Sequence, residues 1–139
     1  MDLGLDAAGC AVQGPPARVI LLDTNALIWL EQGRPRARRL QRQHRRLYIS
    51  PINLLELQFL LEAGRLRLRG TLESLTRDER WLLDDPPAVS WFLHAIDLEW
   101  TRDPFDRLLV AHARLRGWRL ATADKTLLER LSPSDVLEM

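Results

Sequence analysis

The sequence predicts an α/β fold in which a short parallel sheet is covered by helices on both faces. Short strands are expected at 19–22, 47–49 and 118–121, and the first is a continuous apolar run, typical of a strand that is buried on both sides. Each of these segments is followed by polar residues that suit the start of a helix, and this alternation favours parallel pairing of the strands. With 139 residues and 46% hydrophobic content, the chain has the size of one domain with a proper core.

The first apolar run, Val19 to Leu22, is the stretch around which the rest of the chain is organised. Asp23 ends it, because Asp-Thr-Asn side chains seek local hydrogen bonds or water and do not suit a buried strand. A helix is expected from Ala26 onward. Asp23 therefore stands at the carboxyl end of a central strand, the edge at which open α/β sheets bind ligands. A role as helix cap and a role in a ligand site both fit this position.

Composition limits the class of protein and the extent of the domain. Met1 to Ala17 is rich in Gly, Ala and Pro, which predicts a flexible lead over 1–17 and a folded domain over 18–139. The formal net charge of +1 gives no global argument for nucleic acid or a membrane. No apolar run approaches the roughly 20 residues of a membrane span. Cys10 is the lone cysteine, which excludes an internal disulfide and suits a reducing, cytoplasmic compartment.

A basic segment follows the first helix. Arg36 to Arg46 is rich in arginine and has few apolar anchors, chiefly Ala37 and Leu40, so a basic helix is expected. Such a helix could meet phosphates or an acidic partner, or it could simply be solvated, as most charge runs are.

The next helix carries an acid among apolar residues. Ser50 is a suitable N-cap with Pro51 in the first turn, and Gly64 is the expected stop. Helical spacing predicts one buried face, which consists of Ile52, Leu55, Glu56, Phe59, Leu60 and Ala63. A lone buried carboxylate is costly without a partner or a metal ion. Glu56 is therefore interpreted as a site residue shared with Asp23, against the alternative of a structural ion pair with arginine.

The middle of the chain predicts helices and no site residues. Leu72 to Leu83 has helical packing residues, and the break at 84–87 precedes a weaker helix over Ala88 to Leu98. In that second helix Trp91, Phe92, Ala95 and Ile96 are expected in the core. The three histidines at 44, 94 and 112 are scattered, so a histidine zinc site is not expected.

Three further acids mark the C-terminal third. Asp103 is a good N-cap with Pro104 behind it, and the helix ends at Gly117. Asp106 shares the apolar face of that helix, so capping alone does not explain it. Asp124 repeats the situation of Asp23, at the point where the strand at 118–121 gives way to a helix over 125–131. The segment 136–137 is expected to add an edge strand.

Four carboxylates, those of Asp23, Glu56, Asp106 and Asp124, are thus predicted to converge. Without cations they would repel one another, and some would have to stay protonated. Hard oxygen ligands of this kind suit Mg²⁺, and Mn²⁺ as an alternative. An acidic metal site at a sheet edge points to phosphodiester chemistry, in which a metal activates water and neutralises charge on phosphorus.

The chain resembles the PIN-domain ribonucleases, and in particular the VapC toxins of bacterial toxin–antitoxin pairs. The resemblance runs from about Arg18 to the C-terminus and rests on four motifs in order, namely Leu-Leu-Asp-Thr-Asn-Ala-Leu-Ile-Trp at 21–29, Ser-Pro-Ile-Asn-Leu-Leu-Glu-Leu at 50–57, Asp-Pro-Phe-Asp-Arg-Leu-Leu-Val-Ala-His-Ala at 103–113 and Thr-Ala-Asp at 122–124. The third motif is the most specific. The stretch between Leu83 and Trp100 departs from the family pattern, because it is short and interrupted by proline.

The resemblance implies a fold, a chemistry and a set of partners. The fold would be a PIN-like three-layer α/β/α arrangement with a short parallel sheet. The activity would be Mg²⁺-dependent endoribonucleolytic cleavage by a toxin that forms a homodimer and is blocked by a cognate antitoxin. The four acids would be the metal ligands, with Asn25 and Thr122 as polar support and Asp103 as an accessory acid.

A non-catalytic PIN-like module that binds RNA or a protein is the alternative, in which the site would be vestigial. Retention of all four acids favours the nuclease. A receiver-type phosphoacceptor domain is disfavoured, because the acidic pair that it needs after the first strand is missing.

Overall fold

The computed structural model describes residues 19–41 and 46–139. The predicted lead over 1–17 and residues 42–45 of the basic segment, His44 included, lie outside these ranges. The strands are β1 (Val19–Leu22), β2 (Arg46–Ile49), β3 (Leu82–Leu83), β4 (Arg119–Thr122) and β5 (Val136–Glu138). The helices are α1 (Thr24–Glu31), α2 (Arg38–Gln41), α3 (Pro51–Glu62), α4 (Leu72–Leu75), α5 (Ala88–Ile96), α6 (Pro104–Arg116) and α7 (Lys125–Arg130), with 3₁₀ turns η1 (Pro35–Ala37) and η2 (Pro133–Asp135). None of these helices has the length and apolar character needed to cross a bilayer.

The sheet is parallel throughout and β1 lies at its centre. The strand order is β3-β2-β1-β4-β5, and every neighbouring pair is parallel. Leu21 of β1 pairs with Tyr48 on one side and Leu120 on the other. Ile20, Leu21 and Leu22 have no exposed surface, which explains why this strand is a continuous apolar run.

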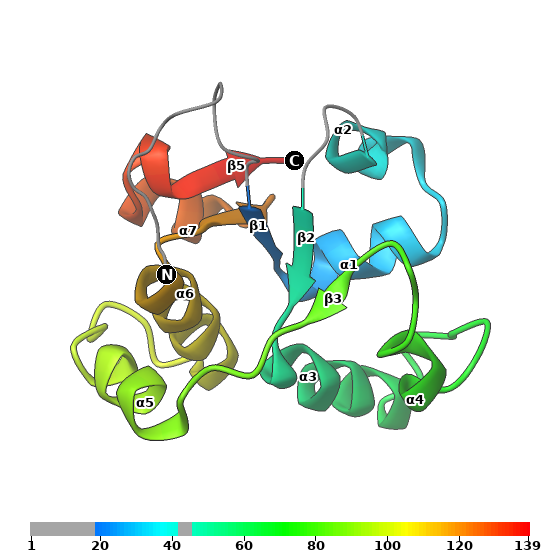
Figure 1. Ribbon diagram of the computed structural model, residues 1–139, viewed down its shortest axis with the longest axis horizontal. Coiled ribbons are helices and arrows are strands. Elements are labelled where there is room, and N and C mark those ends of the chain that lie inside the picture. The colour runs from blue at the N-terminus through cyan, green and yellow to red at the C-terminus, as the bar shows by residue number, and fades with distance from the viewer. Residues whose placement is uncertain (1–18, 42–45) are drawn as a thin grey trace, which may run out of the picture.

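Helices cover both faces of the sheet, as Figure 1 shows, with α1 to α4 on one side and α5 to α7 on the other. Ile20 and Leu22 belong to the core beneath α1, α3 and α4, whereas Leu21 belongs to the core beneath α5, α6 and α7. The alternation follows from the two-residue period of a strand. The predicted three-layer α/β/α fold with a short parallel sheet is confirmed.

Helix caps explain where the two longest helices start and stop. Ser50 caps α3 and Pro51 is its first residue, and Asp103 caps α6 and Pro104 is its first residue, as predicted. Gly64 and Gly117 follow the helix ends with φ angles of 70° and 72°. Only glycine adopts this left-handed conformation without steric cost, so both stops are set locally.

Two predicted helices are wrong in extent. The segment over 72–83 is helical only at Leu72–Leu75, and it ends in the edge strand β3 at Leu82–Leu83. Between them Asp78 accepts hydrogen bonds from the backbone and guanidinium of Arg80 at 2.7–2.9 Å. Such a local turn competes with helix continuation. In its described residues the basic segment contains η1 and α2, and Arg46 belongs to β2. Its expected anchors, Ala37 and Leu40, are buried.

The predicted buried face of α3 is also wrong. Leu55 and Phe59 are about half exposed, at 48% and 51%, whereas Asn53 and Leu57 are buried. The helix has apolar residues of its own on several sides, so their spacing does not identify the face that packs. In α5 the prediction holds for Trp91 and Ala95, which are buried. It fails for Phe92 and Ile96, which are 53% and 61% exposed.

A buried histidine ties α6 to the ends of β2 and β3. His112 Nδ1 lies 2.8 Å from Ser50 Oγ, and Nε2 lies 2.7 Å from the Asp84 carboxylate. Burial lowers the pKa of His112, against the opposing effect of Asp84. Burial acts to raise the pKa of Asp84, but hydrogen bonds from Arg116 and His112 bring it below its usual value. A neutral His112 therefore donates from Nε2 to an ionised Asp84 and accepts a hydrogen bond from the Ser50 hydroxyl at Nδ1.

His112→Leu should lower the free energy of unfolding by about 1–3 kcal/mol, because Ser50 and Asp84 each lose a buried hydrogen-bond partner. His112→Gln should lose less, since a glutamine amide both donates and accepts. Urea unfolding of both variants beside the wild type measures the difference. An equal loss in the two variants would mean that ring packing, and not this hydrogen-bond network, stabilises α6.

Candidate functional site

An acidic pocket lies where β1 and β4 end, at the N-termini of α1, α6 and α7. Its cavity volume is about 120 Å³. The residues that line it are Asp23, Thr24, Asn25, Glu56, Asp103, Asp106, Leu109 and Asp124. The structure therefore brings together all four acids that the sequence singled out, and adds Asp103 as a fifth. None of the lining residues is a lysine or an arginine.

Three of these acids are also helix caps. Asp23 Oδ1 accepts from Ala26 N at 2.7 Å, and Asp124 Oδ1 accepts from Leu127 N at 3.1 Å. Asp103 Oδ1 accepts from Phe105 N at 2.9 Å. The positive ends of three helix dipoles thus face the pocket, which favours negative charge there. Asp23 is therefore both the N-cap of α1 and a residue of the acidic pocket.

Glu56 reaches the pocket from the second turn of α3. It is half-buried and accepts a hydrogen bond from the Thr24 hydroxyl. Thr24 in turn accepts one from Asn53 Nδ2 at 3.1 Å. Among residues 19–41 and 46–139, the hydrogen bond of Glu56 comes from a hydroxyl and not from an arginine, so the alternative of a structural ion pair finds no support there.

Burial and neighbouring charges raise the pKa values of three carboxyl groups in the pocket. Burial raises the pKa of Asp23 to about 6, opposed by hydrogen bonds from Thr122 and Ala26 and supported by the charges of Glu56 and Asp124. Burial raises the pKa of Asp106 to about 7, with added repulsion from Asp103, Asp124, Glu56 and Asp23, in that order. Burial also raises the pKa of Glu56, although the Thr24 hydroxyl opposes the shift. The pocket is therefore short of positive charge.

The predicted accessory residues are placed in three different ways. Asn25 is exposed at the rim of the pocket. Thr122 is fully buried and supports two acids, since it hydrogen-bonds to Asp23 and its Oγ1 accepts from Asp124 N at 3.0 Å. Asp103 lines the pocket and caps α6 at once.

Sequence reasoning missed Thr24 and Asn53. Thr24 lies inside the Asp-Thr-Asn motif, and its position between two candidates was the available signal. Asn53 stands three residues after the N-cap Ser50, at the position of a capping-box partner. That spacing predicts a bond to the Ser50 backbone, and nothing in it predicts a second bond to Thr24.

The donor set fits a hard divalent cation in kind. Carboxylate oxygens are the preferred ligands of Mg²⁺ and Mn²⁺, and the pKa values of Asp23 and Asp106 are raised by burial first and by neighbouring carboxylates in addition. Across residues 19–41 and 46–139, no three His, Cys, Asp or Glu side chains are arranged to hold a metal ion directly. A pocket of about 120 Å³ has room for a few waters, and Mg²⁺ usually keeps several of its own.

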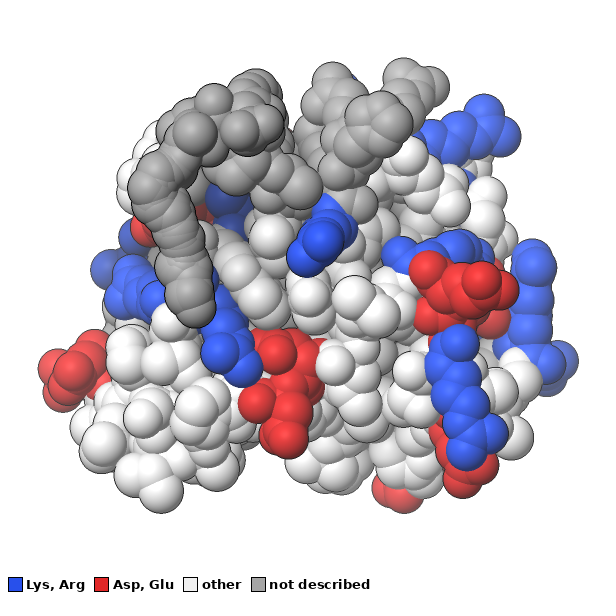
Figure 2. All heavy atoms as spheres, in the orientation of Figure 1, with Lys and Arg blue, Asp and Glu red and all other residues white. Residues whose placement is uncertain are grey.

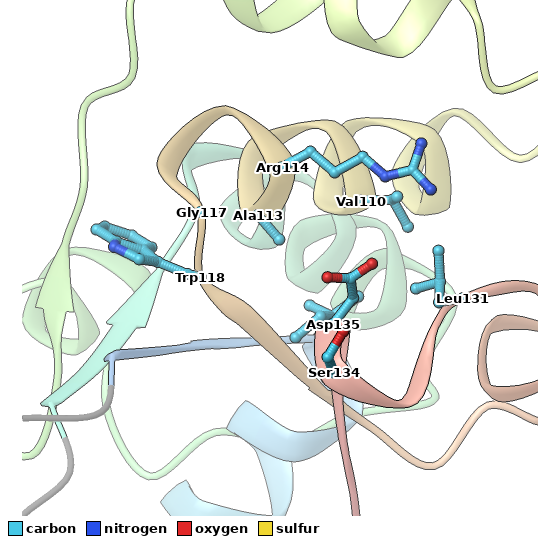
Figure 3. A pocket seen from close by; sticks show the side chains of 9 residues that line it. Val110, Ala113, Arg114, Gly117, Trp118, Leu131, Ser134 and Asp135 are labelled. Carbon is cyan, nitrogen blue, oxygen red and sulfur yellow. The ribbon is translucent and has the colours of Figure 1, made fainter. Parts of the chain in front are cut away.

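A second cavity, shown in Figure 3, lies between α6, β4 and η2. Arg114 from α6 and Asp135 from η2 stand on opposite sides of it, with Trp118 and Leu131 among the other lining residues. It is near the C-terminal end of α6, whereas the acidic pocket is at the N-terminal end. One acid and one cation in an otherwise mixed lining do not make a reactive cluster, so the acidic pocket is the candidate site.

Metal-free protein should become less stable as pH rises from about 4 through about 7. The reason is that the pKa of Asp106 is 3.8 ordinarily and about 7 when folded, so ionisation is costlier in the folded state. Asp106→Asn removes this cost, and its melting temperature should exceed that of the wild type by more at pH 8 than at pH 5. Thermal melts in chelator test this, with Asp97→Asn as an exposed control. An equal difference at both pH values would contradict the prediction.

Comparison with known proteins places the chain in a family. The sequence model of the PIN domain matches residues 20–132. No curated protein sequence matches the chain. Similar solved structures include VapBC2 from Rickettsia felis bound to a promoter DNA fragment, with a TM-score of 0.63, 18% identity, and 87% of this chain and 98% of that chain covered. DNA-bound VapBC from Salmonella typhimurium has a TM-score of 0.60 and 22% identity over 87% of this chain and 98% of that chain.

VapBC-1 from nontypeable Haemophilus influenzae has a TM-score of 0.58 and 24% identity, over 87% of this chain and 96% of that chain. At these identities the solved structures support the fold alone. The family match covers most of the chain and includes β1, the helix of Glu56 and the acids at 103, 106 and 124. The chain belongs to the PIN domain family.

Proposed function

We propose that the protein is a metal-dependent endoribonuclease that cleaves RNA phosphodiester bonds and acts as a VapC-type toxin. The observation that carries this proposal is the acidic pocket. Five carboxylates line one small cavity that has no lysine or arginine in its lining. Such a site suits divalent cation and phosphate much better than it suits an anionic ligand alone.

The chain's own residues would prepare the site in a simple way. Asp23, Glu56, Asp106 and Asp124 would hold Mg²⁺ or Mn²⁺, in part through water. The bound ion would supply charge neutralisation at the phosphate and a more acidic water nucleophile. Thr122 would keep Asp23 and Asp124 in place through the hydrogen bonds described above. The N-termini of α1, α6 and α7 would stabilise the anionic side chains.

Partners follow from the same proposal. The fold neighbours from Rickettsia and Salmonella are toxin–antitoxin complexes bound to DNA, so a cognate antitoxin that blocks the acidic pocket is proposed for this chain too. We propose the cytoplasm as the location, because the protein would encounter its RNA substrate there. The alternative is a non-catalytic PIN-like module for RNA or protein, and retention of every predicted acid in one pocket argues against it.

The direct test is incubation of purified protein with total RNA, with Mg²⁺ and with chelator, followed by mapping of new RNA ends. Asp23→Asn should fold and lose cleavage by orders of magnitude, because a neutral amide is a poor ligand for a hard cation. Full cleavage by that variant, or cleavage in chelator, would overturn the assignment of the metal site.

Asp103 and Asp106 form a matched pair for a second test. Asp103→Asn should keep more activity than Asp106→Asn, because asparagine can still cap α6. Rates of cleavage of one RNA by both variants give the comparison. If the change at Asp103 is the more damaging one, the fifth carboxylate of the pocket is a ligand and Asp106 is not.

A homodimer is also proposed, and α5 supplies a surface for it. Its exposed apolar stripe consists of Val89, Phe92, Leu93 and Ile96, which are 53–74% exposed. These residues surround a shallow apolar depression, and the surface over α5 is largely uncharged in Figure 2. Spacing of three and four residues makes the stripe continuous along the helix, which suits packing against the same helix of a second copy.

Leu93→Glu should convert the protein from dimer to monomer, because a charge would be buried in the contact. Size-exclusion chromatography with light scattering measures the mass. Arg77→Glu, at an exposed position just after α4, is the control and should leave the mass unchanged. A monomeric wild type, or a dimeric Leu93→Glu variant, would exclude the α5 surface as the contact.

A further inference from the structure

A buried chain of hydrogen bonds runs from the N-cap of α3 to Glu56. Ser50 N donates to Asn53 Oδ1 at 2.7 Å, and Asn53 Nδ2 donates to Thr24 Oγ1 at 3.1 Å. Thr24 Oγ1 then donates to Glu56 Oε1. Asn53 has no exposed surface and Thr24 is 4% exposed, so water does not compete at either residue.

The direction of every bond in this chain is determined by its first donor. A backbone N–H can only donate, so the oxygen of the Asn53 amide must face Ser50. The NH₂ group must then face Thr24, whose oxygen has to accept. The single hydroxyl proton of Thr24 is left for Glu56. The Thr24 hydroxyl therefore donates its one proton to Glu56 Oε1, which accepts it as a hydrogen bond.

Helix capping does not account for the second half of the chain. The capping box of α4 is a comparison within the molecule, since Thr71 N donates to Ser74 Oγ in the same way. There the Ser74 hydroxyl returns to Thr71 O, and both residues are exposed. In α3 the same motif continues 29 residues back along the sequence to Thr24, and onward to a carboxylate of the acidic pocket.

Asn53 itself does not line the acidic pocket, whereas Thr24 and Glu56 do. Its side chain can act on the site through Thr24, to which it donates, and through the N-cap of α3, the helix that carries Glu56. Outer hydrogen-bond partners of this kind orient metal-ligating side chains, and their loss typically weakens metal binding about 10–100-fold.

We propose that Asn53 and Thr24 are positioning residues, which keep the carboxylate of Glu56 aimed into the acidic pocket through one directed series of hydrogen bonds from the N-cap of α3. This rests on the proposed function in one respect, namely that Glu56 is a metal ligand. The same series of hydrogen bonds links the start of α3 to the start of α1. It therefore fixes the position of the helix that carries Glu56 relative to the helix that Asp23 caps.

The first test compares two substitutions at Thr24. Thr24→Val keeps the shape and removes the hydroxyl, whereas Thr24→Ser keeps the hydroxyl. The dissociation constant for Mn²⁺, measured by calorimetry, should rise about tenfold or more in Thr24→Val and stay within about twofold of the wild type in Thr24→Ser. Equal binding by Thr24→Val and wild type would overturn the proposal.

The second test uses coupling. Asn53→Ala should also weaken Mn²⁺ binding, and the double variant with Thr24→Val should bind no more weakly than the weaker single variant, because both interrupt one chain. Additive losses would mean that the two residues act separately. Urea unfolding of each variant separates this effect from loss of the α3 cap.

The third readout needs no metal and no activity. In chelator, the side-chain NH₂ of Asn53 should exchange slowly with solvent by NMR, stay slow in Thr24→Ser and exchange faster in Thr24→Val. A wild type that binds no Mn²⁺ would overturn the proposed nuclease, while this experiment would still test the chain. A fast-exchanging Asn53 amide in the wild type would exclude the chain, whatever the RNA assays give.

Discussion

The parallel pairing of β1 with β2 and β4 is the constraint on which the site depends. Parallel strands end at the same edge, so Asp23 after β1 and Asp124 after β4 reach one pocket although 101 positions separate their numbers. The same pairing brings the end of β2 alongside, where Ser50 starts the helix that carries Glu56. An antiparallel neighbour on either side of β1 would send one of these acids to the opposite edge.

Helix starts at this edge give the acids two simultaneous roles. Asp23, Asp103 and Asp124 each satisfy backbone N–H groups at a helix N-terminus, and each lines the acidic pocket. Capping holds these three carboxylates at an edge where their mutual repulsion would otherwise push them apart. Burial, and in addition the remaining repulsion, raises the pKa values of Asp23 and Asp106. A divalent cation would offset both effects.

Two polar networks meet at Ser50. Its hydroxyl hydrogen-bonds to His112 in the C-terminal half of α6, and His112 in turn hydrogen-bonds to Asp84. Its backbone N–H starts the series of hydrogen bonds through Asn53 and Thr24 to Glu56. Ser50 is fully buried, so these bonds form in a medium where an unmade one is costly. α6 is thereby held at both ends, with its acids at the pocket and His112 against β2.

By itself the sequence determined the parallel α/β fold, the helix caps at Ser50 and Asp103, and the acids that converge, because apolar runs, Pro and Gly positions and capping residues act locally. The tertiary structure decided the rest. α3 carries apolar residues on several sides, so the exposure of Leu55 and Phe59 followed from how the helix packs against its neighbours. The edge strand β3 depended on pairing with β2. The bond from Asn53 to Thr24 joins residues 29 positions apart, and no local pattern contains such a contact, because only folding brings the two side chains within reach.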